Sequence, residues 1–196
     1  MTTSPLSITN EQINNLPLLF GIVEDMGVAR TLDTHIRPHG HWQGASVGTL
    51  VVVWLCHILQ ERDHRLVSVR EWVDQRAQTF ARLLGSPLRA TDCTDDRLAN
   101  VLSMLGTADI QAQLDHALVS SWIQTYQLPT ERVRLDSTSV TVYHETDDPQ
   151  SLLKRGHSKD HRPDLLQFKA MLASLDPLGM PICAQMIAGN RADDGL

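Results

Sequence analysis

Asp136 is the residue whose type and position most directly suggest chemistry. It follows the apolar residues of a predicted strand and precedes three hydroxyl residues, Ser137, Thr138 and Ser139. A carboxylate held at the end of a strand suits a divalent cation, and metal-assisted phosphodiester chemistry requires hard oxygen ligands of this kind. One carboxylate cannot hold a pair of metal ions alone. The alternative interpretation is that Asp136 caps a turn together with the neighbouring hydroxyl groups.

The second candidate is a basic segment, residues 154–169, with the sequence KRGHSKDHRPDLLQFK. It contains every lysine of the chain, and Gly156 and Pro163 shape its backbone. Such a concentration of cations suits the oxygens of phosphate groups, although a solvated loop explains the composition equally well. The cations that we expect to contact phosphate groups are Lys154, Arg155, Lys159, Arg162 and Lys169.

The overall charge of the chain argues against one general mode of nucleic-acid binding. The 196 residues carry a formal net charge of −6, and the isoelectric point is about 5.8. A protein that coats nucleic acid through its overall charge is basic, so this mode is excluded, whereas a local basic patch is not.

The histidines and cysteines do not predict a metal site. His157 and His161 have the spacing of ligands on a helix, but Gly156 and Pro163 disfavour a helix between them. The histidines of the segment HIRPHGH, residues 35–41, are expected to lie on the surface. The cysteines lie far apart without CxxC spacing, which predicts neither a zinc knuckle nor a disulfide scaffold: Cys56, Cys93 and Cys183.

Other sequence features restrict the class of protein. The chain contains no GxxxxGK, GxGxxG, GxSxG or HExxH motif. The first residues lack the features of a signal peptide, and the most apolar run, residues 47–59, is too short to cross a bilayer. We therefore expect a protein of the reducing cytoplasm with no membrane partner.

The elements that position these residues divide near residue 129. Before it, apolar residues recur at helical spacing. The expected helices begin at Leu16 and end at Gly27, span residues 45–60, run from a Ser68–Glu71 capping box to Gly85, run from Thr94 to Gly106, and begin again at Thr107.

Beyond residue 129 the pattern becomes strand-like. Residues 132–143 are rich in β-branched side chains, and a change in the parity of the apolar positions predicts a turn or bulge at 136–139. Residues 166–175 and 180–187 are predicted strands joined by the hairpin residues 176–179, which include Pro177 and Gly179. The expected fold class is α+β, with an all-helical region followed by three strands.

Several motifs together resemble bacterial insertion-sequence transposases of the DDE type, in the insertion-sequence-four superfamily. GHSKDHRPDLLQFK is the most distinctive of them, and RLVSVREWV and CTDDRLANVLSML resemble the N-terminal helical region of the same transposases. The resemblance covers essentially the whole chain, and the motifs that carry it lie at residues 65–73, 93–105, 135–139 (LDSTS), 156–169, 176–182 (DPLGMPI) and 188–194 (AGNRADD).

The resemblance implies a helical N-terminal domain, residues 1–128, and an incomplete ribonuclease-H-like catalytic domain with strands 1–3, residues 129–196. Asp136 would be the first acid of the catalytic trio and a ligand of Mg²⁺ or Mn²⁺. The partners implied are transposon ends and target DNA, with a homo-oligomer in the full-length family member and association with the nucleoid of a bacterial cytoplasm. Asp193 and Asp194 match the block that precedes a family helix and are not expected to be the second catalytic acid.

Because the family's second Asp and its Glu follow the third strand, we expect an N-terminal part of a transposase. DNA strand cleavage and transfer would be the activity of the complete enzyme, and this part would be inactive alone. The alternative is a non-catalytic DNA-binding or regulatory truncated transposase. Another ribonuclease-H-like nuclease is a third possibility, and it would equally need further acids.

Overall fold

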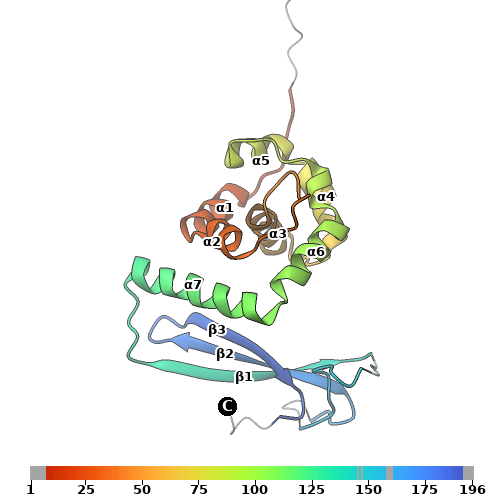
Figure 1. The fold of residues 1–196 in the computed structure, drawn as a ribbon, viewed down its shortest axis with the longest axis vertical. Helices are drawn as coiled ribbons and strands as arrows, with labels where there is room; N and C mark the ends of the chain where they lie inside the picture. Colours follow the sequence, from red (N-terminus) through yellow and green to blue (C-terminus); the bar gives the residue numbers. More distant parts are fainter. Residues whose placement is uncertain (1–7, 145, 147, 158–160, 192–196) are drawn as a thin grey trace, which may run out of the picture. The chain divides into compact units, whose positions relative to one another are not determined.

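The computed structural model describes residues 8–144, 146, 148–157 and 161–191. Helices precede an antiparallel three-stranded sheet, which confirms the expected α+β class. The chain forms two compact units, Met1–Ser121 and Trp122–Leu196. The helices are α1 (Leu16–Asp25), α2 (Val28–His35), α3 (Val47–Glu61), α4 (Leu66–Asp74), α5 (Ala77–Leu84), the 3₁₀ turn η1 (Ala90–Cys93), α6 (Asp95–Leu105) and α7 (Ala108–Tyr126) (Figure 1).

Helix α3 forms the centre of the helical unit. It contacts α1, α2, α4 and α6, which surround it in Figure 1. Its apolar residues include Leu50, Val53 and Cys56, none of which is exposed. Burial of such side chains contributes about 1.5–3 kcal/mol each, so this helix is the main source of the core. The predicted central helix at residues 45–60 is therefore confirmed within two residues at its ends.

Helices α2 and α3 approach each other at backbone distance. Gly48 lies against the backbone of Ala29, where a Cβ atom would overlap the carbonyl oxygen. Asp33 accepts hydrogen bonds from the amide of Gly48 and the hydroxyl of Ser46, both at 2.7 Å. An anion at a helix N-terminus is favourable because the unpaired amides carry partial positive charge there. Asp33 thus fixes the start of α3.

The long helix predicted between Ser68 and Gly85 is wrong, because the structure divides it into α4 and α5. Helix α4 begins before Ser68, at Leu66, and no capping box starts it. The break falls at Gln75 and Arg76. Gly85 ends α5 with a φ of 66°, as its position predicted.

A carboxylate from far along the chain caps α5. Glu11 accepts hydrogen bonds from the backbone amides of Gln78 and Thr79, both at 2.8 Å, and from the Thr79 hydroxyl. Burial raises the pKa of Glu11, but these hydrogen bonds outweigh it, so the pKa lies below its ordinary value. The cap stabilises a helix start that the local sequence does not signal.

The sheet of the second unit has the order β1–β2–β3, with β1 (Val133–Val142), β2 (Leu166–Leu175) and β3 (Met180–Ala188) all antiparallel. Gly179 adopts a φ of 66° in the connection between β2 and β3. This conformation favours glycine and explains its place in the turn. The second and third predicted strands are confirmed, the third with one added residue.

The turn or bulge predicted at residues 136–139 is wrong. Strand β1 is continuous and pairs with β2 in an unbroken register from Val133–Leu175 to Val142–Leu166. The apolar residues change face along the strand without any change in backbone geometry. The irregularity of the sheet lies instead between Ala173 and Ser174, in the pairing of β2 with β3.

Candidate functional site

Asp136 lies within β1, and its Cα is paired with that of Leu172. The residue is exposed. Its Oδ1 atom accepts a hydrogen bond of 2.8 Å from the amide of Ser137. Because the residue lies within a regular strand, neither the expected position at a strand end nor the turn-capping interpretation describes its geometry. The structure holds this carboxylate on a rigid element.

The sheet face that carries Asp136 has one other charged neighbour on the same strand. Side chains alternate along a strand, so Arg134 and Thr138 share the face of Asp136. The Nε atom of Arg134 pairs at 2.6 Å with an oxygen of Asp176, and this ion pair raises the pKa of Arg134. The charge of Arg134 is thus directed to the β2–β3 connection rather than toward Asp136.

The donor set around Asp136 does not form a metal centre by itself. Among the described residues, no group of three or more His, Cys, Asp or Glu side chains is placed to hold a metal ion. Mg²⁺ requires about six oxygen ligands in near-octahedral geometry. Asp136 could supply one of these, and the others would have to come from outside this set.

The basic segment presents two exposed arginines, Arg155 and Arg162, that share one acidic partner. Arg162 donates two hydrogen bonds to the carboxylate of Asp164, at 2.9 and 2.7 Å. Arg155 donates through Nε to the backbone carbonyl of the same residue at 3.1 Å. The bond from Arg162 holds the pKa of Asp164 below its ordinary value. Both guanidinium groups are therefore anchored at the surface.

The predicted lysines occupy different environments. Lys154 is half-buried, and its Nζ donates to the carbonyl of Pro149 at 2.9 Å. Lys169 is only 6% exposed, and its Nζ donates to the carbonyl of Arg191 at 2.7 Å. Lys159 lies outside the described residues. The five predicted cations therefore do not form one uniform patch, and the two arginines are the exposed members among the four that the structure describes.

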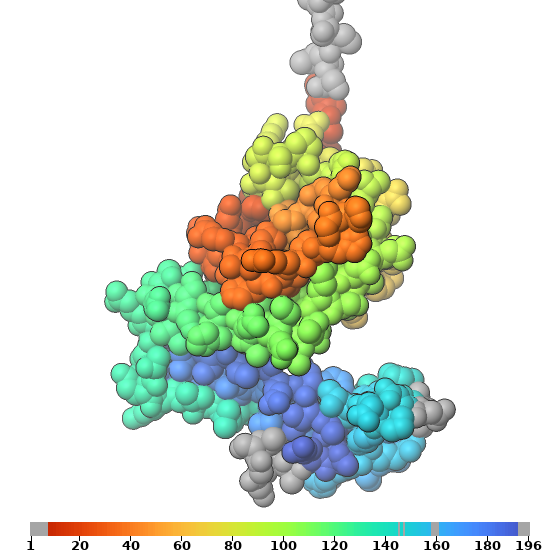
Figure 2. Space-filling model, in the orientation of Figure 1, coloured from red at the N-terminus to blue at the C-terminus, as the bar shows by residue number. Residues whose placement is uncertain are grey.

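Gln167 is a residue of this segment that the sequence analysis missed. Its side chain is fully buried, and its amide nitrogen donates to the carbonyls of His157 at 3.1 Å and Gly189 at 3.2 Å. It therefore joins the basic segment to the end of β3. In Figure 2 the cyan atoms preceding β2 lie against the blue atoms of β3, which agrees with the hydrogen bond from Gly189 to Leu152. A polar residue between Leu166 and Phe168 was the available signal.

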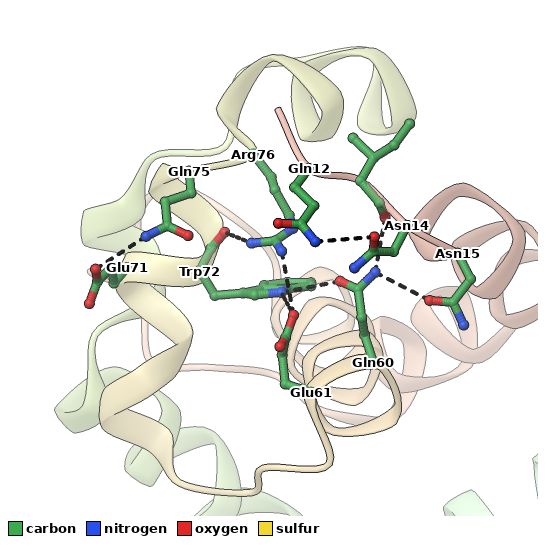
Figure 3. A network of polar contacts seen from close by, with 10 residues as sticks. Gln12, Asn14, Asn15, Gln60, Glu61, Glu71, Trp72, Gln75 and Arg76 are labelled. Atoms are coloured by element: carbon green, nitrogen blue, oxygen red, sulfur yellow. Dashed lines mark hydrogen bonds and ion pairs between the residues drawn. The ribbon is translucent and has the colours of Figure 1, made fainter. Parts of the chain in front are cut away.

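The helical unit contains a polar cleft of about 680 Å³ between α3, α4 and the segment before α1. Figure 3 shows the polar contacts at this cleft, with Trp72 at their centre. The indole nitrogen of Trp72 donates to Gln60 at 3.2 Å and Glu61 at 2.9 Å, and Arg76 lies over the ring at 4.9 Å. His57 is buried beside Trp72, and burial lowers its pKa.

The polar groups of the cleft largely satisfy one another. Arg76 donates to the carbonyl of Trp72 at 3.1 Å and to Glu61 at 3.4 Å, and Arg65 forms an ion pair of 2.9 Å with Asp63. Through Glu61, Arg76 joins α3 to the residues that follow α4. We therefore interpret the cleft as part of the packing of the helical unit.

The fold and its site define an α+β protein in which a helical unit precedes an antiparallel sheet with an exposed strand carboxylate. The chain belongs to the family of the domain of unknown function DUF4277, whose family model matches residues 8–120. This match covers the helices α1 to α6 and most of α7. Comparisons with curated proteins and with solved structures find no match for this chain. Within the described residues, every helix is too short or too polar to cross a bilayer.

Proposed function

We propose that this chain is the N-terminal part of a DDE transposase, with a ribonuclease-H-like sheet that acts in phosphoryl transfer on DNA. The observation that carries the proposal is the exposed carboxylate of Asp136 in the first strand of the β1–β2–β3 sheet. The LDSTS and GHSKDHRPDLLQFK motifs, which resemble those of such transposases, lie in the same unit.

In the proposed reaction, the residues of this chain bind and orient DNA. Arg155 and Arg162 would contact backbone phosphates, because planar guanidinium groups form paired hydrogen bonds with phosphate oxygens. Asp136 would provide one ligand for Mg²⁺ or Mn²⁺. When bound, such ions neutralise charge on the attacking and leaving oxygens. Cleavage requires further carboxylates, because the described donor set is incomplete.

A second candidate function is DNA binding without catalysis, as in a regulatory truncated transposase that competes for transposon ends. This function is favoured because the described residues do not complete a metal site, whereas the exposed Arg155 and Arg162 suit the phosphate groups of DNA. This protein would bind the ends or form mixed oligomers with an active transposase.

Terminal inverted-repeat DNA that flanks the coding sequence separates the two candidates. Gel-shift titration would measure binding, and incubation with Mg²⁺ or Mn²⁺ would measure strand cleavage. If the protein acts as a transposase, it cleaves the DNA, either alone or mixed with a separate polypeptide that supplies further carboxylates. Asp136→Asn should abolish this cleavage. Glu131→Gln is the matched control, because it changes an exposed acid of the same unit to its amide.

Binding without cleavage, unaffected by Asp136→Asn, would establish the regulatory alternative. Cleavage that Asp136→Asn leaves intact, or the absence of both binding and cleavage with wild-type protein, would contradict both candidates. Asp136→Asn is not expected to unfold the protein, since the side chain is exposed and surface substitutions change stability by about 0.5 kcal/mol or less.

A further inference from the structure

Two polar side chains of β2, Gln167 and Lys169, are buried on one face of the sheet. They are two residues apart on a regular strand, so they point to the same side. Gln167 is fully buried, and Lys169 is 6% exposed. Burial of an amide and an ammonium costs free energy unless hydrogen bonds compensate, which makes their partners informative.

Gln167 joins three segments of the second unit through its backbone and side chain. Its backbone forms an antiparallel bridge with Lys154, with hydrogen bonds of 2.9 and 3.1 Å. Its side-chain amide donates to the carbonyls of His157 and Gly189. Since both acceptors are carbonyl oxygens, the nitrogen of the amide must face them. The basic segment and the end of β3 are thus held by a single side chain.

Two glycines make this arrangement possible. A Cβ atom on Gly156 would lie 2.7 Å from the carbonyl oxygen of Gly189 and 3.3 Å from the amide nitrogen of Gln167. A Cβ atom on Gly189 would overlap the carbonyl oxygen of Gln167. The segments therefore meet at backbone distance, and a larger residue at either glycine would separate them.

Lys169 holds the residues that follow β3. Its ammonium donates to the carbonyl of Arg191 at 2.7 Å, and its Cα is paired with Ser139 on one side and Ile187 on the other. A carbonyl oxygen and a surrounding sheet are the environment of a structural ammonium. A lysine with no such acceptor lays its stem along apolar surface and keeps the charged head in water.

We propose that Gln167 and Lys169 are positioning residues that clamp residues 152–157 and 189–191 to β2, and thereby set the place of Arg155. The DNA-binding part of this inference rests on the proposed function. It assigns Lys169, a cation of the basic segment, to the support of the DNA-binding surface, and it leaves the arginines as the phosphate contacts.

Amide hydrogen exchange of the full chain tests the clamp without DNA. Gln167→Met keeps the length of the side chain but removes both donated hydrogen bonds, and Lys169→Met removes the ammonium. We expect the amides of Lys154 and Gly189 to exchange about fivefold faster in Gln167→Met, because the hydrogen bond lost beside each of them contributes about 1 kcal/mol, while amides of central β2 residues such as Leu172 keep their rates. Gln185→Met, the same change at an exposed position of β3, is the control.

Gly156→Ala provides an independent probe of the same contact. It leaves Gln167 and Lys169 in place but introduces the Cβ atom that meets Gly189. If the clamp exists, this variant also exposes the amides of Lys154 and Gly189 to faster exchange. Unchanged exchange of these amides in both Gln167→Met and Gly156→Ala would overturn the proposal.

DNA binding gives a readout that a purely structural role would not change. The slope of log affinity against log salt counts the phosphates neutralised, so Arg155→Ala should lower both the affinity and the slope, the latter by about one. Gln167→Met and Lys169→Met should lower the affinity for a labelled DNA duplex by about threefold to tenfold and leave the slope unchanged. Lys169→Arg, which retains a donor, should restore part of the affinity.

The outcomes separate the clamp from the proposed function. A slope that falls by about one in Lys169→Met would make Lys169 a phosphate contact and overturn its positioning role. If folded Gln167→Met and Lys169→Met bind DNA with wild-type affinity, these residues do not set the place of Arg155, and the positioning role is overturned. If the wild-type protein binds no DNA while the exchange rates change as expected, the proposed function fails and the clamp remains.

Discussion

At the scale of single residues, two aspartates show opposite relations between exposure and role. Asp136 is exposed, and its carboxylate accepts a hydrogen bond from the adjacent amide of Ser137. Asp92 is 3% exposed and accepts hydrogen bonds from Arg89 at 3.1 Å and Arg97 at 3.4 Å. A carboxylate that the fold does not use is available to a ligand, whereas one enclosed by two guanidinium groups is committed to structure.

Asp92→Ala should strongly destabilise the helical unit. Arg97, which donates to Asp92, also donates to the carbonyls of Gln43 and Ala45 and lies 4.2 Å from the ring of Trp42, so Asp92 belongs to a network that ties α6 to the segment before α3. Asp92 is buried, but the side chains of Arg89 and Arg97 are 65% and 20% exposed, so the loss of their charge-assisted hydrogen bonds should cost about 1.5–3 kcal/mol. Urea denaturation measures the change in the free energy of unfolding. Asp95→Ala, at an exposed residue in the first turn of α6, should cost about 1 kcal/mol or less, and an equal loss in the two variants would contradict this role of Asp92.

At the scale of elements, the success of sequence prediction depended on how local the determining contacts are. Strand β2 was predicted with its observed ends, because turn-forming residues follow it directly. Helix α2 was missed, because its single buried residue, Leu32, gives little periodic signal. The division between α4 and α5 was missed for a different reason. The cap of α5 comes from Glu11, which lies 67 residues before Gln78.

The candidate site follows the same rule. Asp136 could be located from the apolar residues before it, and its environment could not, since the parity change suggested a turn. The burial of Lys169 depends on a carbonyl of Arg191, and that of Gln167 on carbonyls of His157 and Gly189. These partners become neighbours only when β2 pairs with β3 and with the basic segment. Composition therefore identified the cations but could not separate exposed arginines from a buried lysine.

Gly48→Ala tests the close approach of α2 and α3. The added methyl group would overlap the carbonyl of Ala29, so the helices must separate, which costs about 1–3 kcal/mol in a packed core. Gly21→Ala is the matched control, because this glycine of α1 has open space around its Cβ position. It should stabilise the protein by about 0.5–1 kcal/mol through helix propensity. Thermal unfolding measures both, and stabilisation by Gly48→Ala would contradict the observed packing.

At the scale of the whole molecule, ionisable groups link the stability of the helical core to pH. Cys56 and Cys93 are fully buried in that core, while Cys183 is exposed. Burial raises the pKa of Cys56 to about 11. Burial, followed by the nearby charge of Asp92, raises the pKa of Cys93 to about 12. The apolar environment favours the neutral thiol, because it cannot solvate a thiolate.

Alkaline pH should therefore weaken the helical unit through these two thiols. The unfolded chain releases the thiol protons above about pH 9, whereas the folded protein retains them to about pH 11. Between these values the unfolded state binds fewer protons, so the free energy of unfolding falls by about 1.4 kcal/mol per pH unit for each thiol. Urea denaturation from pH 8 to 11 should show a shallower decline in Cys56→Ala and Cys93→Ala than in the wild type. Cys183→Ala should follow the wild-type curve, and a decline that is equally steep in all three variants would show that the buried thiols do not contribute.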